Sequence, residues 1–213
     1  MFTSPLYWIA DASLAGGRPL VDLAQEAIAA GLQVYQYREK TLSHKDQYPI
    51  ALALADLARA TGTTFVVNDG IDLALVVKAH GVHLGQEDFP VKDARRILGT
   101  KMLIGCSAHT FDQAKAAEAD GADYLGVGPI YESTTKMARA PLGCEKLREI
   151  CEAVRIPVYA IGGVTVERCR EVLAAGAKGV AVASGLLQPS IGKQTKAFLR
   201  ALAAAPHRAQ KVD

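Results

Sequence analysis

The sequence predicts an α/β protein in which parallel strands and helices alternate along the whole chain. One pattern occurs four times: a helix that ends at a glycine suited to the left-handed conformation, followed at once by a short apolar strand. The copies lie at residues 30–34, 79–84, 119–125 and 175–180. Further apolar runs that suit strands separate them, at residues 6–10, 64–67, 102–106 and 157–161. Together these segments predict eight strand–helix units and hence a single (β/α)8 TIM barrel.

The elements follow one another in the order that such a barrel requires. After the first strand, helical periodicity covers residues 20–30, and the second strand begins at Leu32. Similar periodicity covers residues 45–59, 111–119 and 166–175, which predicts parallel pairing with right-handed crossovers. A doubly wound open sheet is the alternative, but no GxGxxG motif follows the first strand. We expect one domain, residues 1–213, with a short polar tail from about residue 206.

Composition narrows the class of protein. Half of the residues are hydrophobic, and the 24 Lys and Arg residues nearly balance the 22 Asp and Glu residues, which argues against a dedicated nucleic-acid-binding protein. The four cysteines form no CxxC pair and no metal-ligand spacing, so reduced thiols in a cytoplasmic protein are expected. No basic segment precedes the first apolar run, and no run of about 18 apolar residues occurs. We therefore expect neither a signal peptide nor a membrane span.

Active-site residues of a barrel lie at the carboxyl ends of its strands. Seven predicted strand ends carry polar or glycine-rich segments, at residues 36–40, 68–69, 85–88, 107–110, 126–136, 162–163 and 183–185. Gln36, Arg38 and Lys40 point the same way if the second strand persists, because side chains alternate with a period of two. Such groups at the end of a buried strand are costly unless an anion meets them, so we expect a phosphate or diphosphate there. The alternative is that the strand has ended and the charges lie in solvent.

Two carboxylates at the ends of adjacent strands, Asp69 and Asp88, could converge on one metal ion. Hard oxygen ligands, completed by water and a substrate phosphate, suit Mg²⁺. The alternative is that each aspartate only starts a helix. Asn68 would face away from Asp69 on a regular strand, so the strand must break there if both are to meet a ligand.

Two further groups suit a second phosphate. Residues 133–136 lie in a long hydroxyl-rich loop that could close as a lid, or could be only a solvated polar loop. Residues 162–163 and 183–185 suit a phosphate site built from backbone N–H groups and a short helix, although a tight turn would also use such glycines.

The remaining ionisable candidates are less informative. His109, after the fifth strand, is either a general acid or base or a packed histidine. His80 and His83 have no ligand-like neighbours in the sequence and are expected to be structural. Glu39 and Glu87 are expected to face away from a ligand or to orient their neighbours.

Six motifs together resemble the thiamine-phosphate synthase family. They are Gln36-Tyr37-Arg38-Glu39-Lys40, Asn68-Asp69, His83-Leu84-Gly85-Gln86-Glu87-Asp88, Ser107-Ala108-His109-Thr110, Gly126-Val127-Gly128-Pro129 and Ile161-Gly162-Gly163-Val164. The resemblance implies a transferase that joins 4-amino-2-methyl-5-hydroxymethylpyrimidine diphosphate to 4-methyl-5-(2-phosphoethyl)thiazole, plain or carboxylated. The products would be thiamine phosphate and diphosphate. It implies Mg²⁺ as cofactor and small molecules as partners, and it leaves open a homo-oligomer.

The resemblance also implies which residues bind each substrate. The pyrimidine diphosphate would be held by Gln36, Tyr37, Arg38, Glu39, Lys40, Asn68, Ser107 and Lys136. The thiazole phosphate would be held by Ser133, Thr134, Thr135, Gly163, Ala183 and Ser184. Asp69 and Asp88 would bind Mg²⁺, and the catalytic residues would be Arg38, Lys40, Lys136 and Ser107.

Two departures from the family pattern stand out. Met137-Ala138-Arg139 follows Lys136, where family members often carry a second Lys and an Asp, and this could alter lid closure. Cys106 precedes Ser107, where Val is common, and a small hydrophobic residue of similar size should have a mild effect.

The predicted reaction is dissociative: the C–O bond breaks first, and the thiazole nitrogen then attacks the pyrimidine cation. The family resemblance implies the same course. Three alternatives remain: a thiazole tautomerase of the same superfamily, a sugar-phosphate isomerase on the same barrel, and a non-catalytic sensor of a thiamine precursor. A tautomerase would use the histidine of the fifth loop and would not need Gln36, Arg38, Lys40, Asp69 and Asp88 together.

Overall fold

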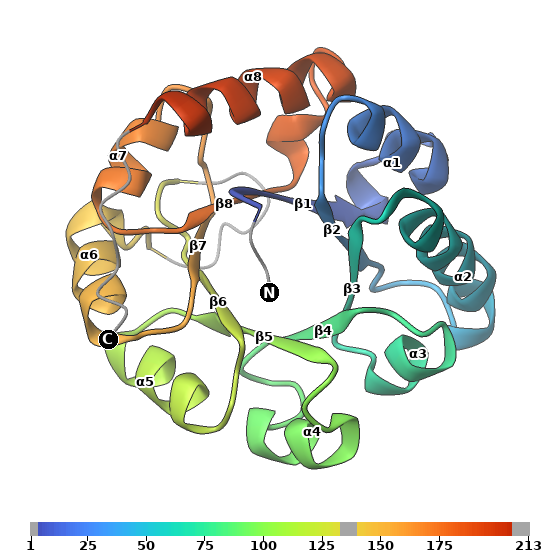
Figure 1. Ribbon diagram of the computed structural model, residues 1–213, viewed down its shortest axis with the longest axis horizontal. Coiled ribbons are helices and arrows are strands. Elements are labelled where there is room, and N and C mark those ends of the chain that lie inside the picture. Colours follow the sequence, from blue (N-terminus) through green and yellow to red (C-terminus); the bar gives the residue numbers. More distant parts are fainter. Residues whose placement is uncertain (1–3, 133–139, 206–213) are drawn as a thin grey trace.

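A closed barrel of eight parallel strands, ringed by eight helices, is formed by residues 4–132 and 140–205, the part of the chain that the computed structural model describes (Figure 1). The strands are β1 (Leu6–Asp11), β2 (Val34–Arg38), β3 (Thr64–Asn68), β4 (Gly81–Leu84), β5 (Leu103–Ala108), β6 (Tyr124–Val127), β7 (Val158–Ile161) and β8 (Gly179–Val182). Each strand pairs with the next in the sequence, and β8 pairs with β1. The predicted TIM barrel is confirmed.

Helices cover the outside of the barrel, one after each strand. They are α1 (Leu20–Ala29), α2 (His44–Thr61), α3 (Ile71–Val76), α4 (Val91–Leu98), α5 (Phe111–Ala119), α6 (Gly143–Ala153), α7 (Cys169–Ala174) and α8 (Ile191–Ala204). Two short 3₁₀ helices follow the first and last strands, η1 (Ala12–Leu14) and η2 (Ser184–Leu186).

The repeated glycines end helices as predicted in three of the four copies. These three residues have φ angles of +105°, +95° and +103°, and they are Gly31, Gly121 and Gly176. The prediction was wrong for Gly81, which is the first residue of β4, while Lys78 takes the positive φ, at +55°. A Cβ at Gly81 would lie 2.6 Å from the backbone oxygen of Leu103. This glycine is therefore needed for the close approach of β4 and β5.

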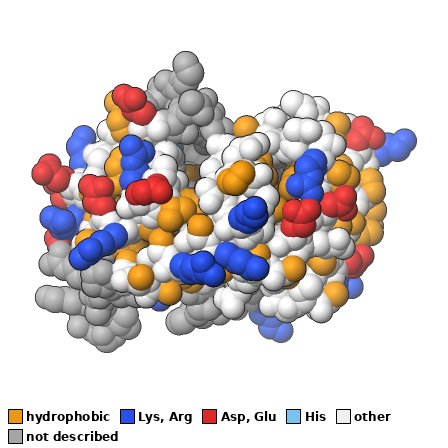
Figure 2. Space-filling model, turned by 90° about the horizontal axis from the view of Figure 1, so that it is seen from above, with side chains coloured by type: hydrophobic (Ala, Val, Ile, Leu, Met, Phe, Trp, Pro, Cys, Tyr) orange, Lys and Arg blue, Asp and Glu red, His pale blue; other side chains and the backbone are white. Residues whose placement is uncertain are grey.

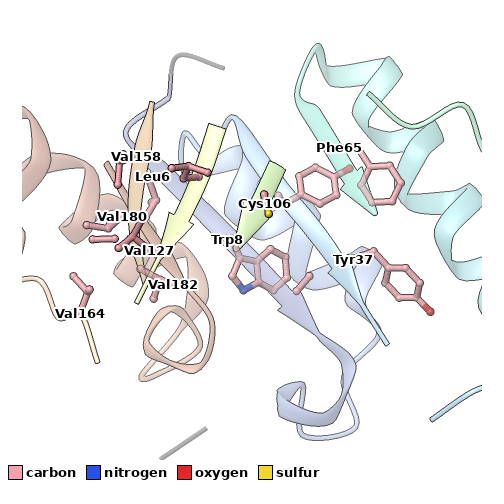
Figure 3. Packing of buried hydrophobic residues seen from close by; sticks show 14 of the residues in the cluster. Leu6, Trp8, Tyr37, Phe65, Cys106, Val127, Val158, Val164, Val180 and Val182 are labelled. Carbon is pink, nitrogen blue, oxygen red and sulfur yellow. The ribbon is translucent and has the colours of Figure 1, made fainter. Parts of the chain in front are cut away.

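Side-chain alternation sorts the core into two layers. The smaller cluster fills the barrel interior and consists of Tyr7, Ile9, Val34, Val66, Tyr124, Tyr159 and Ala181. The larger cluster lies between strands and helices, and Figure 3 labels several of its members, including Trp8, Tyr37 and Phe65. Because interior positions on β2 begin at Val34 and recur every second residue, Gln36 and Arg38 also face the interior.

The outer surface carries both signs of charge. Figure 2 shows acidic and basic side chains interspersed with apolar ones on one side of the barrel. Within the described part of the chain, no helix combines the length and the apolar character needed to cross a membrane.

Candidate active site

An ion pair holds Arg38 at the carboxyl end of the barrel interior. Arg38 ends β2 and lies opposite Asp11, the last residue of β1, and its Nη1 donates to Asp11 Oδ2. Asp11 Oδ1 also accepts from the backbone N of Ser13 at 3.0 Å and from its Oγ at 2.6 Å. The Asp11 side chain is 5% exposed and that of Arg38 is 25% exposed, so a buried carboxylate holds one terminal nitrogen of a guanidinium that is still partly accessible. Sequence reasoning missed Asp11, although it directly follows the apolar run of the first strand.

Lys40 reaches the same end of the barrel by a different route from the one predicted. β2 ends at Arg38, so Lys40 lies in the following loop and does not share a strand face with Gln36. Its Nζ instead forms an ion pair with Asp69 Oδ2. The two cations of the motif therefore lie next to two different carboxylates, one on β1 and one just after β3.

A break in β3 turns Asp69 toward its neighbour. β3 ends at Asn68, whose position in the alternation follows Val66 on the interior side. Asp69 has a φ of +62°, and its N–H donates to the His83 carbonyl oxygen at 2.9 Å. A left-handed conformation is uncommon outside glycine and is often found at functional sites. The interruption that the sequence required for Asn68 and Asp69 is thus present.

Asp69 and Asp88 lie side by side. Burial raises the pKa of the Asp69 carboxyl, the neighbouring Asp88 carboxyl raises it further, and Lys40 opposes the shift. Asp88 is held by the backbone N–H of Gly85, which donates to Oδ2 at 2.7 Å. Both aspartates line a hollow of about 410 Å³ together with Glu87, Phe89 and Pro90.

The chemistry of this pair suits a divalent cation. Two adjacent carboxylates, one of them made harder to ionise by the other, favour a positive charge between them. Among the described residues, no group of three or more His, Cys, Asp or Glu side chains forms a metal site. Water and substrate oxygens would therefore complete the coordination of Mg²⁺, which seldom has an all-protein cage.

Ser107 has a buried histidine as its partner. His83 Nε2 lies 2.9 Å from Ser107 Oγ, and His83 Nδ1 lies 3.2 Å from Tyr124 Oη. His83 is buried and hydrogen-bonded inside the barrel, as expected of a structural histidine, but its contact with Ser107 was not foreseen. The alternation along β4 could have indicated this contact, because Val82 and Leu84 belong to the outer cluster and His83 therefore points into the barrel. On the other side of the interior, Gln36 Nε2 donates to Tyr7 Oη.

The side chains of Tyr37 and Glu39 point elsewhere. The Tyr37 ring lies in the outer hydrophobic cluster (Figure 3), and burial raises the pKa of its hydroxyl to about 12. Only the backbone of Tyr37 remains for contact with a ligand. Glu39 Oε1 accepts from the N and Oγ1 of Thr41, each at 2.6 Å. Glu39 therefore orders its own loop, in line with the expectation that it orients its neighbours.

The strand ends of β7 and β8 form the other half of the candidate site. Gly162 and Gly163 have φ angles of +90° and +65°, and Arg168 Nη1 donates to the Gly163 carbonyl oxygen at 2.7 Å. A Cβ at Gly163 would lie 2.4 Å from the backbone oxygen of Glu132, so only glycine fits. Ala183 precedes η2, which begins at Ser184 as the predicted short helix.

The expectations for His109 and for the loop after β6 stay predictions. His109 Nδ1 contacts the Gly128 carbonyl oxygen, at the start of the loop that follows β6. The predicted lid residues, Ser133, Thr134, Thr135 and Lys136, lie outside the described residues, as does the departure Met137-Ala138-Arg139.

Comparison with known proteins decides the family. Residues 6–186 match the family model of thiamine monophosphate synthase. The chain belongs to this family. It is 46% identical over 198 residues to the thiamine-phosphate synthase of Chloroflexus aurantiacus, covering 92% of this chain and 91% of that relative. The thiamine-phosphate synthase of Moorella thermoacetica is 45% identical over 183 residues, covering 85% of this chain and 87% of the relative.

A solved structure of a family member has the same fold. The thiamine phosphate pyrophosphorylase of Pyrococcus furiosus superimposes with a TM-score of 0.84 at 35% identity, covering 93% of this chain and 95% of that one. The resemblance carried by the six motifs is confirmed.

Proposed function

We propose that this protein is a thiamine-phosphate synthase, which joins 4-amino-2-methyl-5-hydroxymethylpyrimidine diphosphate to 4-methyl-5-(2-phosphoethyl)thiazole and releases diphosphate. The observation that carries the proposal is the grouping of two cations, Arg38 and Lys40, with the carboxylate pair Asp69 and Asp88 at one end of the barrel. A diphosphate with a bound divalent cation complements this grouping, whereas a single phosphate would leave part of it unused.

Charge stabilisation is the chief task of these residues. As the C–O bond breaks, its electron pair leaves with the diphosphate, and Arg38 and Lys40 are placed to stabilise the developing negative charge. Asp11 keeps the guanidinium in one orientation, so little reorganisation accompanies bond breaking. When bound by Asp69 and Asp88, Mg²⁺ would supply further neutralisation of the diphosphate oxygens.

The second half of the reaction needs no side-chain nucleophile. The aminopyrimidine ring delocalises the positive charge left on its methylene carbon, and the thiazole nitrogen lone pair then forms the new C–N bond. Gly163, Ala183 and Ser184 would hold the thiazole phosphate from the β7 and β8 side. Gln36, Asn68 and Ser107 would hold the pyrimidine from the β2, β3 and β5 side.

A Mg²⁺-dependent assay with both substrates tests the proposal. We expect stoichiometric release of diphosphate and thiamine phosphate, and no product without Mg²⁺. Asp69→Ala should lower synthase activity at least about 100-fold, because it removes one of the two proposed ligands. Asp72→Ala is a matched control, since Asp72 is a nearby carboxylate on α3 whose side chain is 66% exposed. A thiazole tautomerase would release no diphosphate and would tolerate Asp69→Ala, and either result would refute the proposed function.

A further inference from the structure

A chain of hydrogen-bonded side chains crosses the barrel interior from Gln36 to Ser107. Gln36 Nε2 donates to Tyr7 Oη, which lies 3.0 Å from Tyr124 Oη. Tyr124 Oη lies 3.2 Å from His83 Nδ1, and His83 Nε2 lies 2.9 Å from Ser107 Oγ. Gln36, Tyr7, Tyr124 and His83 are each at most 9% exposed. These hydrogen bonds therefore connect Gln36 on β2 with Ser107 on β5, the two residues that would hold the pyrimidine, beneath the proposed pocket.

Two glycines leave room in the barrel for this series of hydrogen-bonded side chains. A Cβ at Gly105 of β5 would lie 2.1 Å from Tyr124 Cζ and 2.5 Å from His83 Nδ1. A Cβ at Gly126 of β6 would lie 3.2 Å from His83 Cε1. The Tyr7 and Tyr124 rings pack edge to face, with their centroids 5.9 Å apart. Close packing therefore fixes the rings, and the freedom that remains in the chain is the direction of its hydrogen bonds.

Two directions let donation pass the same way through every link of this series of side chains. Burial raises the pKa of both Tyr7 and Tyr124, so each phenol keeps its proton and can donate one hydrogen bond while accepting another. A neutral imidazole donates from one nitrogen and accepts at the other. If Gln36 donates to Tyr7, donation runs on through Tyr124 to His83 Nδ1, and Nε2–H then donates to Ser107. In the reverse direction Ser107 donates to His83, and Gln36 accepts from Tyr7 through its oxygen.

The two directions present opposite groups to a ligand. In the first, which the orientation of the Gln36 amide supports, Gln36 Oε1 is left as an acceptor and the Ser107 hydroxyl proton is left as a donor. A 4-aminopyrimidine matches this arrangement, since its amino group donates and its ring nitrogens accept. A 4-oxopyrimidine does not match, because its carbonyl oxygen would meet the Gln36 oxygen and one ring nitrogen carries a proton.

We infer that Tyr7, Tyr124 and His83 are positioning residues that fix the hydrogen-bonding direction of Gln36 and Ser107 and so select a 4-amino over a 4-oxo pyrimidine. The inference rests on the proposed function, because it takes the aminopyrimidine diphosphate as the ligand. None of the three residues needs to touch the substrate, and their effect is transmitted through the side chains at the two ends of the chain.

Substrate discrimination is the first test. We expect the wild-type protein to favour the 4-amino over the 4-oxo pyrimidine diphosphate by at least about 100-fold in kcat/KM, as sites built to hydrogen-bond one group reject its mismatch. Tyr7→Phe removes the oxygen that orients the Gln36 amide, so the ratio should fall at least about tenfold. Tyr159→Phe is the matched control: its ring packs 5.9 Å from Tyr7, but its hydroxyl donates to the Ser4 carbonyl oxygen at 2.7 Å. An unchanged ratio in Tyr7→Phe, or an equal fall in Tyr159→Phe, would overturn the inference.

The protonation of His83 in the free wild-type protein is the second test and needs no activity. Long-range ¹⁵N–¹H correlation spectra should show a protonated Nε2 and an unprotonated Nδ1, with the signals assigned by their loss in His83→Asn. A protonated Nδ1 with an unprotonated Nε2 would mean the reverse direction and would overturn the inference even if the synthase reaction proceeds. Conversely, absence of diphosphate release would refute the proposed function, while this spectrum would still decide the direction of the chain.

Discussion

Gly85→Ala should weaken the proposed Mg²⁺ site without altering the rest of the barrel. A Cβ at Gly85 would lie 2.8 Å from Asp88 Oδ2, and among the described residues its other contact within 4 Å is the Asp88 Cγ at 3.8 Å. Restoring an ordinary contact of 3.4 Å requires the carboxylate to retreat by about 0.6 Å. That movement also lengthens the hydrogen bond from the Gly85 N–H, which is now 2.7 Å.

The expected effect is a rise of about 10- to 100-fold in the Mg²⁺ concentration needed for half-maximal activity, the range found when a group that orients a metal ligand is lost. The measurement is the rate of diphosphate release over a Mg²⁺ titration at saturating substrates. Gly192→Ala on α8 is the control, because its Cβ would meet its nearest neighbour, the Glu26 backbone oxygen, at 3.8 Å. The reasoning is refuted if Gly85→Ala and Gly192→Ala show the same Mg²⁺ dependence as the wild type.

Three further substitutions probe other parts of the site. Arg38→Ala should raise KM for the pyrimidine diphosphate about 100-fold and change KM for the thiazole phosphate little, and equal losses for both would contradict the division between the two subsites. Gly163→Ala should affect the other substrate and raise KM for the thiazole phosphate at least about tenfold, because its Cβ would lie 2.4 Å from the Glu132 backbone oxygen. Gly105→Ala should lower the free energy of unfolding in urea by about 1–3 kcal/mol or more, because its Cβ would meet the buried Tyr124 ring at 2.1 Å. A urea midpoint equal to that of the wild type would show that the interior is less tightly packed.

Local sequence patterns were sufficient to predict the fold. The alternation of apolar strands with helices predicted the barrel, because each element shows its own period in a short window of sequence. The rule that active-site residues lie at the carboxyl ends of barrel strands then predicted that the carboxylates and cations gather at one face. The exception at Gly81 is instructive, since its glycine serves the contact with β5 and no helix end. A short sequence window cannot separate these two uses of glycine.

Contacts between strands could not be predicted in the same way. The contacts of Asp11 and His83 were missed because their partners, Arg38 and Ser107, are 27 and 24 residues away and become neighbours only when the barrel forms. The break after Asn68 could be stated only as a requirement, because the left-handed conformation of Asp69 and its hydrogen bond to the His83 carbonyl oxygen appear only when β3 and β4 pair. Lys40 lies in the loop after β2 and not on the strand as expected, and its ion pair with Asp69 forms only because β2 and β3 are neighbours.

The sequence by itself determined the barrel, the family and the face on which the site lies, because strand period, helix period and motif order are properties of neighbouring residues. Only the tertiary structure decided which polar groups meet inside the barrel. Tyr7 and Tyr124 are 117 residues apart, and their hydroxyls come within 3.0 Å because the sheet closes on itself and turns both side chains toward one axis. Barrel closure is a property of all eight strands together, so no single segment of the sequence contains it.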